Sequence, residues 1–412
     1  MKILVKNSMD LSGEIFAGGS KNAALPIMAA SMLCDGKTEI SGLPKLLDTD
    51  NMKSIMQDIG VKIKENSFDS ANLYSFSAPY EKVKKLRGSI LIASPLLVRF
   101  GRCQIPLPGG CPIGTRPIDQ HLKGFMALGA KCETYHGMVD IRCNRLKGGR
   151  IYLDFPSVGA TENLVMAASM AEGTTVIENA AAEPEVEDLC NFLNKMGAKI
   201  EGAGGNTIRI DGVKKLKGTE YTVIPDRIEA GTYLTAFAIT KSKGIVRNVK
   251  FEHQKPLVAK LMEMGIKIKE TDDGYYIDAT GSIKSASIKT LPYPGFPTDM
   301  QAQFSSLLSV TKGTGIIVET IFENRFLHIG ELLRMGASIK VEGRTSVIEG
   351  VKKLTGARVE ARDLRGGAAL VLAALVADGE TEISGAQHIL RGYENFSEKL
   401  NKIGCDISIF DT

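Results

Sequence analysis

The sequence contains no tryptophan, and aromatic residues make up only 6% of its 412 positions. A core must therefore be built mainly from aliphatic side chains and Met, as is common in packed α/β proteins. The first ten residues lack the apolar stretch of a signal peptide, and no later segment approaches the roughly 20 apolar residues that span a bilayer. These absences predict a soluble cytoplasmic protein without a membrane partner.

Signals for metals, disulfides and common cofactors are missing too. The seven cysteines are scattered and never spaced as C-x-x-C, which favours reduced thiols. The five histidines do not pair at ligand spacings, so we expect no metal. Neither a phosphate-binding loop nor a dinucleotide-binding glycine motif is present, and we predict no cofactor. The net charge of +4 is modest, and the basic run 81–87 is typical of a solvated helix face. We therefore predict no nucleic-acid partner.

What the sequence does contain is an internal repeat. A landmark made of an apolar residue, glycine, two further residues and Ile or Cys occurs six times, at intervals of 68 to 71 residues. A second glycine lies upstream of each landmark and opens a short β-like run. The landmark glycines are Gly60, Gly129, Gly197, Gly265, Gly336 and Gly404, and the upstream ones are Gly36, Gly101, Gly173, Gly244, Gly313 and Gly379. Two markers that share one period predict six copies of one unit.

The apolar spacing within a unit predicts its elements. Met52, Ile55, Met56 and Ile59 follow the i, i+3, i+4, i+7 pattern of an amphipathic helix, and the glycine that follows can close that helix in the left-handed conformation. More uniformly apolar stretches, such as 23–33, 163–171 and 368–377, predict helices buried on most sides. Each unit therefore has the order strand, buried helix, strand, amphipathic helix and two strands.

The size of the unit predicts how the copies are grouped. About 68 residues are too few to bury both helices, so neighbouring units should share a core. The pattern is interrupted by charge and a proline at 214–228, between the third and fourth units. We therefore predict an α/β (α+β) protein of two domains with three units each. A continuous six-unit solenoid is the alternative.

The loop 107–117 holds a candidate reactive thiol. Three glycines and three prolines preclude helix or strand there, so Cys111 lies on a loop beside flexible backbone N–H groups and five residues from Arg116. Such a setting can lower the pKa of a thiol and let it act as a nucleophile or proton donor. The alternative is a spectator thiol.

Other segments favour anion binding. At 17–26, glycines and Ser20 lead into a helix, and Lys21 beside helix N–H groups suits phosphate or carboxylate, although a simple capped helix is equally open. Later units carry polar insertions around Asp299, Arg325, Arg365 and Arg391. These should gather at one end of their domain, where the arginine fork can bind an anion at two points. Taken singly, each insertion fits a surface ion pair as well.

Eight motifs in order resemble a known family over essentially the whole chain: GGSKNAALP, LPGGCPIGTRPID, PSVGATENL, PDRIEAGTY, FPTDMQAQF, ENRFLHI, DLRGGAAL and RGYE. They are similar to the bacterial enolpyruvyl transferases that begin peptidoglycan synthesis, in the EPSP synthase superfamily. The resemblance implies a two-domain inside-out α/β barrel built from six repeats, with the active site in the interdomain cleft. It places residues 21–228 in the first domain and residues 1–20 plus 229–412 in the second.

The resemblance also implies the chemistry. In the family, the 3-hydroxyl of UDP-N-acetylglucosamine attacks C2 of phosphoenolpyruvate while C3 is protonated, and phosphate then leaves. Cys111 matches the proton donor, which also forms an adduct with phosphoenolpyruvate and is alkylated by fosfomycin. Asp299 matches the carboxylate that takes the hydroxyl proton. Lys21, Arg116 and Arg391 match the cations that hold phosphoenolpyruvate.

Further positions match the family's contacts with the sugar nucleotide or its cleft residues: Asn22, Arg87, Arg116, Pro117, Ile118, Asp119, Gln120, Phe155, Pro156, Ser157, Val158, Asp299, Ile321, Arg325, Asp363 and Arg365. Phe155-Pro156 departs from the Lys-Val of some members, so the nucleotide contact there should be through backbone or stacking. The nearest alternative is the shikimate-pathway transferase, which lacks the cysteine loop; Ser20-Lys21-Asn22 and Gly110-Cys111 favour the sugar nucleotide. A non-enzymatic repeat protein is an alternative from another class.

Overall fold

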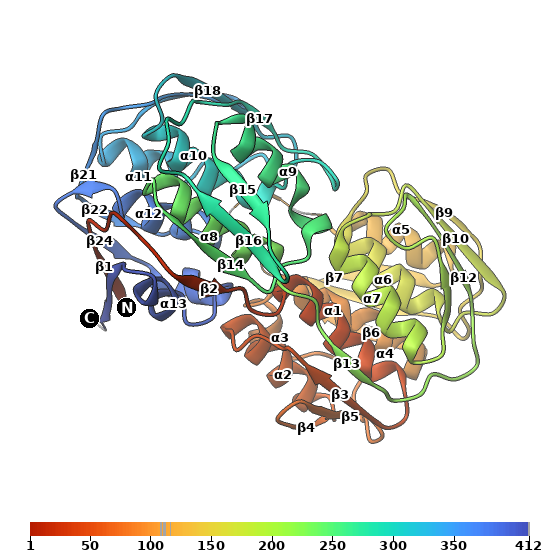
Figure 1. Cartoon of the computed structure of the whole chain (residues 1–412). Helices are drawn as coiled ribbons and strands as arrows, with labels where there is room; N and C mark the ends of the chain where they lie inside the picture. Colours follow the sequence, from red (N-terminus) through yellow and green to blue (C-terminus); the bar gives the residue numbers. More distant parts are fainter. Residues whose placement is uncertain (108, 110–112, 116, 411–412) are drawn as a thin grey trace. The chain divides into compact units, whose positions relative to one another are not determined.

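The computed structural model describes residues 1–107, 109, 113–115 and 117–410. Contacts between Cα atoms divide the chain into two compact units (Figure 1). The first unit comprises Gly19–Cys111 and Thr115–Ile224, and the second comprises Met1–Gly18, Pro112–Gly114 and Pro225–Thr412. Helices and strands alternate through both units, which confirms the predicted two-domain α/β fold and excludes the continuous solenoid.

The first unit contains three repeats. The first consists of α1 (Lys21–Ala30), η1 (Ser31–Leu33), β3 (Lys37–Ser41), α2 (Leu47–Asp58), β4 (Lys62–Lys64) and β5 (Ser67–Asp69). The second consists of α3 (Tyr80–Val83), η2 (Arg87–Ile92), α4 (Ala93–Phe100), β6 (Arg102–Pro106), α5 (Asp119–Ala127), β7 (Lys131–Tyr135) and β8 (Met138–Arg142). The third consists of β9 (Arg150–Tyr152), α6 (Val158–Ala168), β10 (Thr174–Glu178), α7 (Pro184–Lys195), β11 (Lys199–Glu201) and β12 (Thr207–Asp211), and β13 (Glu220–Thr222) follows it.

The second unit contains the other three repeats and the N-terminal strands β1 (Lys2–Lys6) and β2 (Glu14–Phe16). The fourth repeat consists of α8 (Arg227–Ile239), β14 (Lys243–Arg247), α9 (Phe251–Glu263), β15 (Lys267–Glu270) and β16 (Gly274–Asp278). The fifth consists of β17 (Ile288–Lys289), η3 (Thr298–Met300), α10 (Gln301–Ser309), β18 (Thr314–Val318), α11 (Ile329–Arg334), β19 (Ser338–Glu342) and β20 (Thr345–Glu349). The sixth consists of β21 (Leu354–Thr355), β22 (Arg358–Glu360), α12 (Leu364–Ala374), β23 (Ala377–Asp378), β24 (Glu380–Ser384), η4 (Ala386–Arg391), α13 (Phe396–Lys402) and β25 (Asp406–Phe410).

Each repeat has one small sheet, and three of the six sheets include a strand from elsewhere in the chain. The sheets run β13-β3-β5-β4, β6-β8-β7 and β11-β12-β10-β9 in the first unit. In the second unit they run β15-β16-β14-β2, β17-β18-β20-β19 and β22-β24-β1-β25, with a small β21-β23 pair. Strands on either side of a buried helix pair in parallel, as β9 with β10 around α6 and β17 with β18 around α10. The remaining pairs in each four-stranded sheet are antiparallel. In four of these sheets a hairpin extends the parallel pair, whereas in the sixth repeat the N-terminal strand β1 lies between β24 and β25.

In the first and fourth repeats, the parallel strand comes from a distant part of the sequence. β13 pairs with β3, with Tyr221 opposite Ile40. β2 pairs with β14, with Ile15 opposite Val246. The strand that precedes α1 in the sequence therefore completes the sheet of the fourth repeat, and the strand that precedes α8 completes that of the first. Apart from the short segment Pro112–Gly114, the chain crosses from one unit to the other at residues 18–19 and again at 224–225.

The helices fall into the two predicted kinds. Every residue of α10, and every residue from Ile228 to Ile239 in α8, is buried, whereas α2 and α9 bury one face. The buried helices begin two to five residues before the predicted starts at 23, 163 and 368. Each is capped by a polar side chain that accepts a backbone N–H: Ser20, Ser157 or Asp363. The apolar run therefore marked the buried part of each helix and missed its capped start.

The glycine landmarks have the predicted conformation. All six landmark glycines have φ between 89° and 114°, which confirms that they end the amphipathic helices in the left-handed region. Among the upstream glycines, Gly244 is the exception because it lies inside β14. A Cβ at Gly244 would meet the Phe237 ring at 2.3 Å, and the nearest preceding left-handed residue is Lys241, with φ 52°. Gly244 is thus required by close packing.

Candidate functional site

The start of α1 holds a lysine whose side chain is mostly covered. The Ser20 hydroxyl accepts the Ala23 N–H at 3.3 Å, so the simple capping role considered for this segment is present. Lys21 follows directly, and its Nζ lies 3.3 Å from Oδ2 of Asp48 in the first turn of α2. The two side chains are only 12% and 5% exposed. Asn22 is half-buried beside them. The structure therefore fixes an ammonium group at a helix N-terminus, where an anion is favoured.

The two stretches assigned to the sugar nucleotide lie side by side in the first unit. Gln120 joins them, because its Oε1 accepts the Asp154 N–H at 3.0 Å and its Nε2 donates to the Asp154 carboxylate at 3.0 Å. Asp154 immediately precedes the exposed Phe155. Half-buried Arg87 donates to the Pro117 carbonyl at 3.5 Å, which places it at the same surface. Of the predicted nucleotide contacts, the structure thus brings together Arg87, 117–120 and 155–158.

His121, which the sequence analysis did not single out as a site residue, lies beneath this surface. It is 5% exposed, and a Cβ added at Gly159 would lie 3.3 Å from its ring. Asn163 donates through Nδ2, at 2.9 Å, to the His121 Nδ1, because the Asn163 Oδ1 accepts the Ser94 hydroxyl. An amide nitrogen only donates, so Nδ1 is the acceptor and Nε2 carries the hydrogen. Its position next to 117–120 was the sequence signal that could have identified it.

Burial and the nearby Arg87 guanidinium lower the pKa of His121 to about 3. The unfolded chain binds this proton with a pKa of about 6.5, so proton binding lowers the free energy of the unfolded state as pH falls from about 6.5 toward 3. We expect the free energy of unfolding to fall by about 2 kcal/mol more between pH 7 and pH 5 in the unmodified protein than in His121→Gln. Urea unfolding at the two pH values measures this difference. Equal losses in both proteins would contradict a buried neutral imidazole.

Asp299 is the centre of the candidate site in the second unit. It lies in η3, and its Oδ1 is 2.8 Å from Nη2 of Arg325. Its Oδ2 is 3.3 Å from both Nε and Nη2 of Arg365. The arginine side chains are 4% and 2% exposed, whereas Asp299 retains 26%. The surface ion pair considered for each segment is therefore wrong for Arg325 and Arg365, since both are buried and converge on one carboxylate that solvent still reaches.

Asp363 and Arg391 are two further predicted site residues of the second unit. Asp363 caps α12 by accepting the N–H groups of Arg365 and Gly366 at 3.0 and 2.9 Å. The Arg365 guanidinium lies 5.1 Å from the centre of the Tyr393 ring, two residues beyond half-buried Arg391 at the end of η4. The N-cap of α12 therefore fixes the backbone that carries Arg365.

Glu319 is a second residue that the sequence analysis missed. It follows β18 and is 1% exposed, and its carboxylate accepts hydrogen bonds from two backbone N–H groups and two threonine hydroxyls. One N–H belongs to Ile321, which was predicted to contact the sugar nucleotide, and one hydroxyl belongs to Thr298, next to Asp299. The carboxylate therefore joins two segments that were assigned to the site separately.

Two predicted residues, Cys111 and Arg116, lie outside the described residues. The described cysteines include several poor nucleophiles, because burial raises the pKa of Cys132 to about 11 and that of Cys190 and Cys405 to about 12. These thiols give little reaction with an alkylating reagent at neutral pH.

Over residues 1–107, 109, 113–115 and 117–410, no group of three or more His, Cys, Asp or Glu side chains could hold a metal ion. Within the same residues, no helix is long and apolar enough to cross a membrane.

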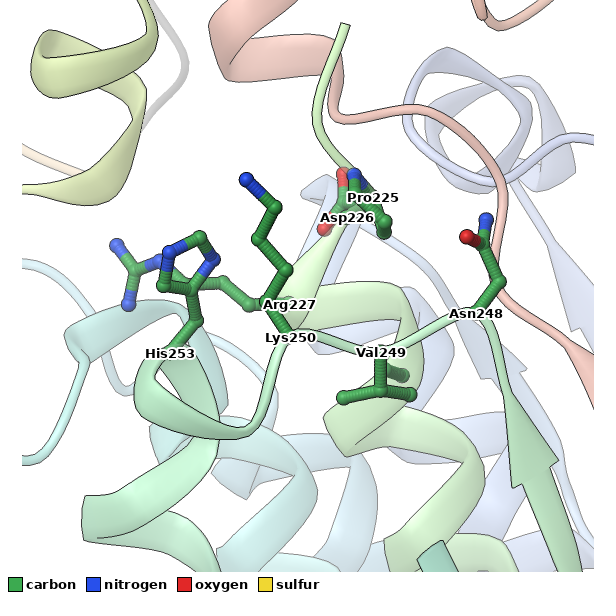
Figure 2. Close-up of a pocket in the computed structure, with 8 residues that line it drawn as sticks. Pro225, Asp226, Arg227, Asn248, Val249, Lys250 and His253 are labelled. Carbon is green, nitrogen blue, oxygen red and sulfur yellow. The ribbon is translucent and has the colours of Figure 1, made fainter. Parts of the chain in front are cut away.

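A shallow pocket lies at the start of α8, outside the predicted site (Figure 2). Its empty volume is about 140 Å³, open to solvent. Arg227, Lys250 and His253 line it together with Asp226, which caps α8 by accepting the N–H groups of residues 228 and 229. None of the predicted site residues lines this pocket. Asp299 and its two buried arginines are therefore a stronger indication of the functional site than this pocket is.

Comparison with known proteins defines the class. The model of the EPSP synthase (3-phosphoshikimate 1-carboxyvinyltransferase) family matches residues 5–400. The enolpyruvyl transferase NikO from Streptomyces tendae superimposes with a TM-score of 0.88 at 23% identity, over 99% of this chain and 98% of that one. An EPSP synthase from Acinetobacter baumannii gives 0.77 at 18% identity, over 99% and 100%. The fold is thus that of the enolpyruvyl transferases.

Closer relatives place the chain within that class. A UDP-N-acetylglucosamine 1-carboxyvinyltransferase 2 of Carboxydothermus hydrogenoformans is 53% identical over 98% of both chains. A UDP-N-acetylglucosamine 1-carboxyvinyltransferase 1 of Caldanaerobacter subterraneus subsp. tengcongensis is 52% identical over 98% of this chain and 99% of its own. The chain therefore belongs to the UDP-N-acetylglucosamine 1-carboxyvinyltransferases of the EPSP synthase family, and it is a transferase.

Proposed function

We propose that this protein transfers the enolpyruvyl group of phosphoenolpyruvate to the 3-hydroxyl of UDP-N-acetylglucosamine and releases phosphate, the first committed step of peptidoglycan synthesis. Identity above 50% over 98% of the chain to transferases named for this acceptor supports the choice of substrate. The observation that carries the chemistry is the carboxylate of Asp299, which two buried guanidinium groups hold at a solvent-accessible position.

In the proposed reaction, the sugar 3-oxygen forms a bond to C2 of phosphoenolpyruvate, and its proton passes to Asp299. C3 receives a proton from Cys111, which gives a tetrahedral adduct. Phosphate then leaves from C2 with the electron pair of the C–O bond and takes one proton from C3, which restores the double bond. The proton held by Asp299 passes through solvent to the Cys111 thiolate, so both groups return to their starting states. An ion-paired carboxylate is a weak base, but the hydroxyl proton becomes acidic as the C–O bond forms, so transfer to Asp299 is feasible. Lys21, Arg116 and Arg391 would offset the charge of phosphoenolpyruvate.

The proposal assigns the other predicted contacts to the sugar nucleotide. Arg87, 116–120 and 155–158 would hold the nucleotide, with Phe155 stacking or binding through its backbone, and Asn22 and Ile321 would face the sugar. The proposal assigns Lys21 and Arg391, which belong to different units, to one substrate. It therefore requires the interdomain cleft and the domain boundaries expected from the sequence.

Phosphoenolpyruvate and UDP-sugars are cytoplasmic metabolites, so we propose a cytoplasmic enzyme that needs no cofactor, metal, nucleic acid or membrane. Roles in cell shape and division follow from peptidoglycan synthesis.

The acceptor is tested by phosphate release. We expect the purified protein to release phosphate from phosphoenolpyruvate with UDP-N-acetylglucosamine and not with shikimate 3-phosphate, because the chain carries the cysteine loop that the shikimate enzyme lacks. A continuous phosphate assay with each acceptor measures this. Release with shikimate 3-phosphate alone would assign the other branch of the family, and no release with either would favour a non-enzymatic repeat protein.

The control for this assay uses the thiol at Cys111. Fosfomycin should abolish phosphate release and add one covalent group at Cys111, detected by peptide mass spectrometry, and both substrates together should protect the thiol. Cys132, Cys190 and Cys405 should remain unlabelled because burial raises their pKa. Labelling of Cys111 at the same rate with and without substrates would contradict its place in the site.

A further inference from the structure

One buried carboxylate connects two segments of the candidate site in the second unit. Glu319 Oε1 accepts the backbone N–H of Ile321 at 2.8 Å and that of Phe322 at 3.1 Å. The same oxygen accepts the Thr290 hydroxyl at 2.9 Å. Its other oxygen, Oε2, accepts the Thr298 hydroxyl at 2.8 Å. Four donors therefore satisfy both oxygens of a side chain that is 1% exposed.

The Oε2 bond leads to the proposed base. Thr298 is the first residue of η3, and Asp299 is the second. The guanidinium groups of Arg325 and Arg365 hold the end of the Asp299 side chain, but they do not hold the backbone from which it projects. In the described contacts, the Thr298 hydroxyl is what ties the side chains of η3 to the end of β18. The direction of Asp299 thus depends on the two arginines at the end of its side chain and on the Thr298 bond next to it in η3.

The Oε1 bonds lead to the segment after β18. Two consecutive N–H groups converge on one oxygen, which fixes the turn at Ile321 and Phe322. Arg325 lies further along this segment, and its guanidinium is 5.5 Å from the centre of the Phe322 ring. Thr290 closes the arrangement, because its hydroxyl oxygen also accepts the Thr320 N–H at 2.9 Å. Glu319 therefore sets the backbone of the segment that carries Ile321.

We propose that Glu319 is a positioning residue for the reaction, which sets the direction of Asp299 through the Thr298 hydroxyl and the place of Ile321 through the backbone N–H bonds. This inference rests on the proposed function. Glu319 does not touch substrate; it acts by fixing, on one buried side chain, the relative placement of the base and of the segment that contacts the sugar nucleotide. Small displacements of a base relative to its substrate lower the rate steeply.

The test is a cycle of variants assayed by phosphate release with UDP-N-acetylglucosamine and phosphoenolpyruvate. Thr298→Val removes only the bond from the Thr298 hydroxyl to Glu319 Oε2, which positions Asp299. We therefore expect kcat to fall about 10-fold while the KM for the sugar nucleotide stays within about twofold. Glu319→Ala should lower kcat at least as much and also raise that KM about 10-fold, because the Ile321 segment loses its acceptor. In Glu319→Ala/Thr298→Val, kcat should equal that of Glu319→Ala, since both changes remove one interaction.

Conservative and matched variants separate positioning from stability. Glu319→Gln keeps Oε1, and its amide can donate to the Thr298 hydroxyl, so kcat should stay within about threefold of the unmodified value. Thr311→Val removes a comparable buried hydroxyl bond, to the Leu307 carbonyl of α10, and should leave kcat and KM unchanged. If Glu319→Ala does not fold, Thr298→Val and Glu319→Gln still decide the question.

The outcomes distinguish this inference from the proposed function. An unchanged kcat in Thr298→Val, multiplicative losses in the double variant, or a Glu319→Gln protein as impaired as Glu319→Ala would each overturn the positioning role while leaving the reaction in place. No phosphate release by the unmodified protein would overturn both. Falls in thermal stability without the split between kcat and KM would assign Glu319 to the fold alone.

Discussion

Asp299→Asn should lower kcat for phosphate release by about 10³, within the range that a general base contributes. The amide cannot take the 3-hydroxyl proton, yet its oxygen can still accept a hydrogen bond from Arg325 or Arg365. We therefore expect the KM for UDP-N-acetylglucosamine to change by less than about fivefold, since both arginines stay in place. Steady-state phosphate assays with each substrate varied in turn measure the two effects separately.

The same substitution removes the charge that compensates two buried arginines, so its effect on the fold needs its own measurement. Asp299 is 26% exposed, and solvent offsets part of the loss. We expect the free energy of unfolding to fall by about 1 to 2 kcal/mol. Asp272→Asn, at an exposed position of the same unit, is the matched control and should change neither quantity. A kcat within threefold of the unmodified enzyme would exclude Asp299 as the base.

The fold could be predicted from the sequence because the same local rules recur in every repeat. Six glycines mark the ends of amphipathic helices, and each has the required left-handed conformation. The apolar runs identified the buried helices but not their starts, because the capping residues Ser20, Ser157 and Asp363 are polar and lie outside the runs. Gly244 also falls at the repeat period, but it is required because a Cβ there would clash with Phe237. The period alone does not reveal this reason.

The exchange of β2 and β13 between the units does not follow from the repeat. Periodicity predicts a strand before each buried helix, but it does not say which sheet that strand joins. The structure pairs Ile15 with Val246 and Tyr221 with Ile40, across more than 180 positions of sequence in each case. Only the resemblance to a family gave the expectation that residues 1–20 join the C-terminal domain.

The candidate site shows the same limit at the level of side chains. Asp299, Arg325 and Arg365 were selected as interruptions of the repeat and by resemblance, and the structure brings them together. Glu319 was missed because one acidic residue in IIVETIF is unremarkable until its donors, 2 to 29 positions away, are known. His121 was missed because its partner Asn163 lies in another repeat. Residues that act through distant partners leave little local signal.

Lys21→Met should lower kcat/KM for phosphoenolpyruvate by about 10² to 10³, as is typical when one group that stabilises substrate charge is removed. The side chain is 12% exposed, so little water is available to replace the ammonium. Asp48, 5% exposed, would also lose a cation 3.3 Å away, and the variant should be less stable for that reason. Phosphate assays and urea unfolding on the same preparations measure both effects.

A second change separates these two effects of the lysine. In Lys21→Met/Asp48→Asn the buried negative charge is removed together with its partner, so part of the lost free energy of unfolding should return. The rate should not return, because the substrate anion still lacks the ammonium. Lys45→Met, an exposed position three residues before Asp48, is the matched control and should leave both stability and rate unchanged. If activity recovered along with stability in the double variant, Lys21 would hold α1 against α2 and would not bind phosphoenolpyruvate.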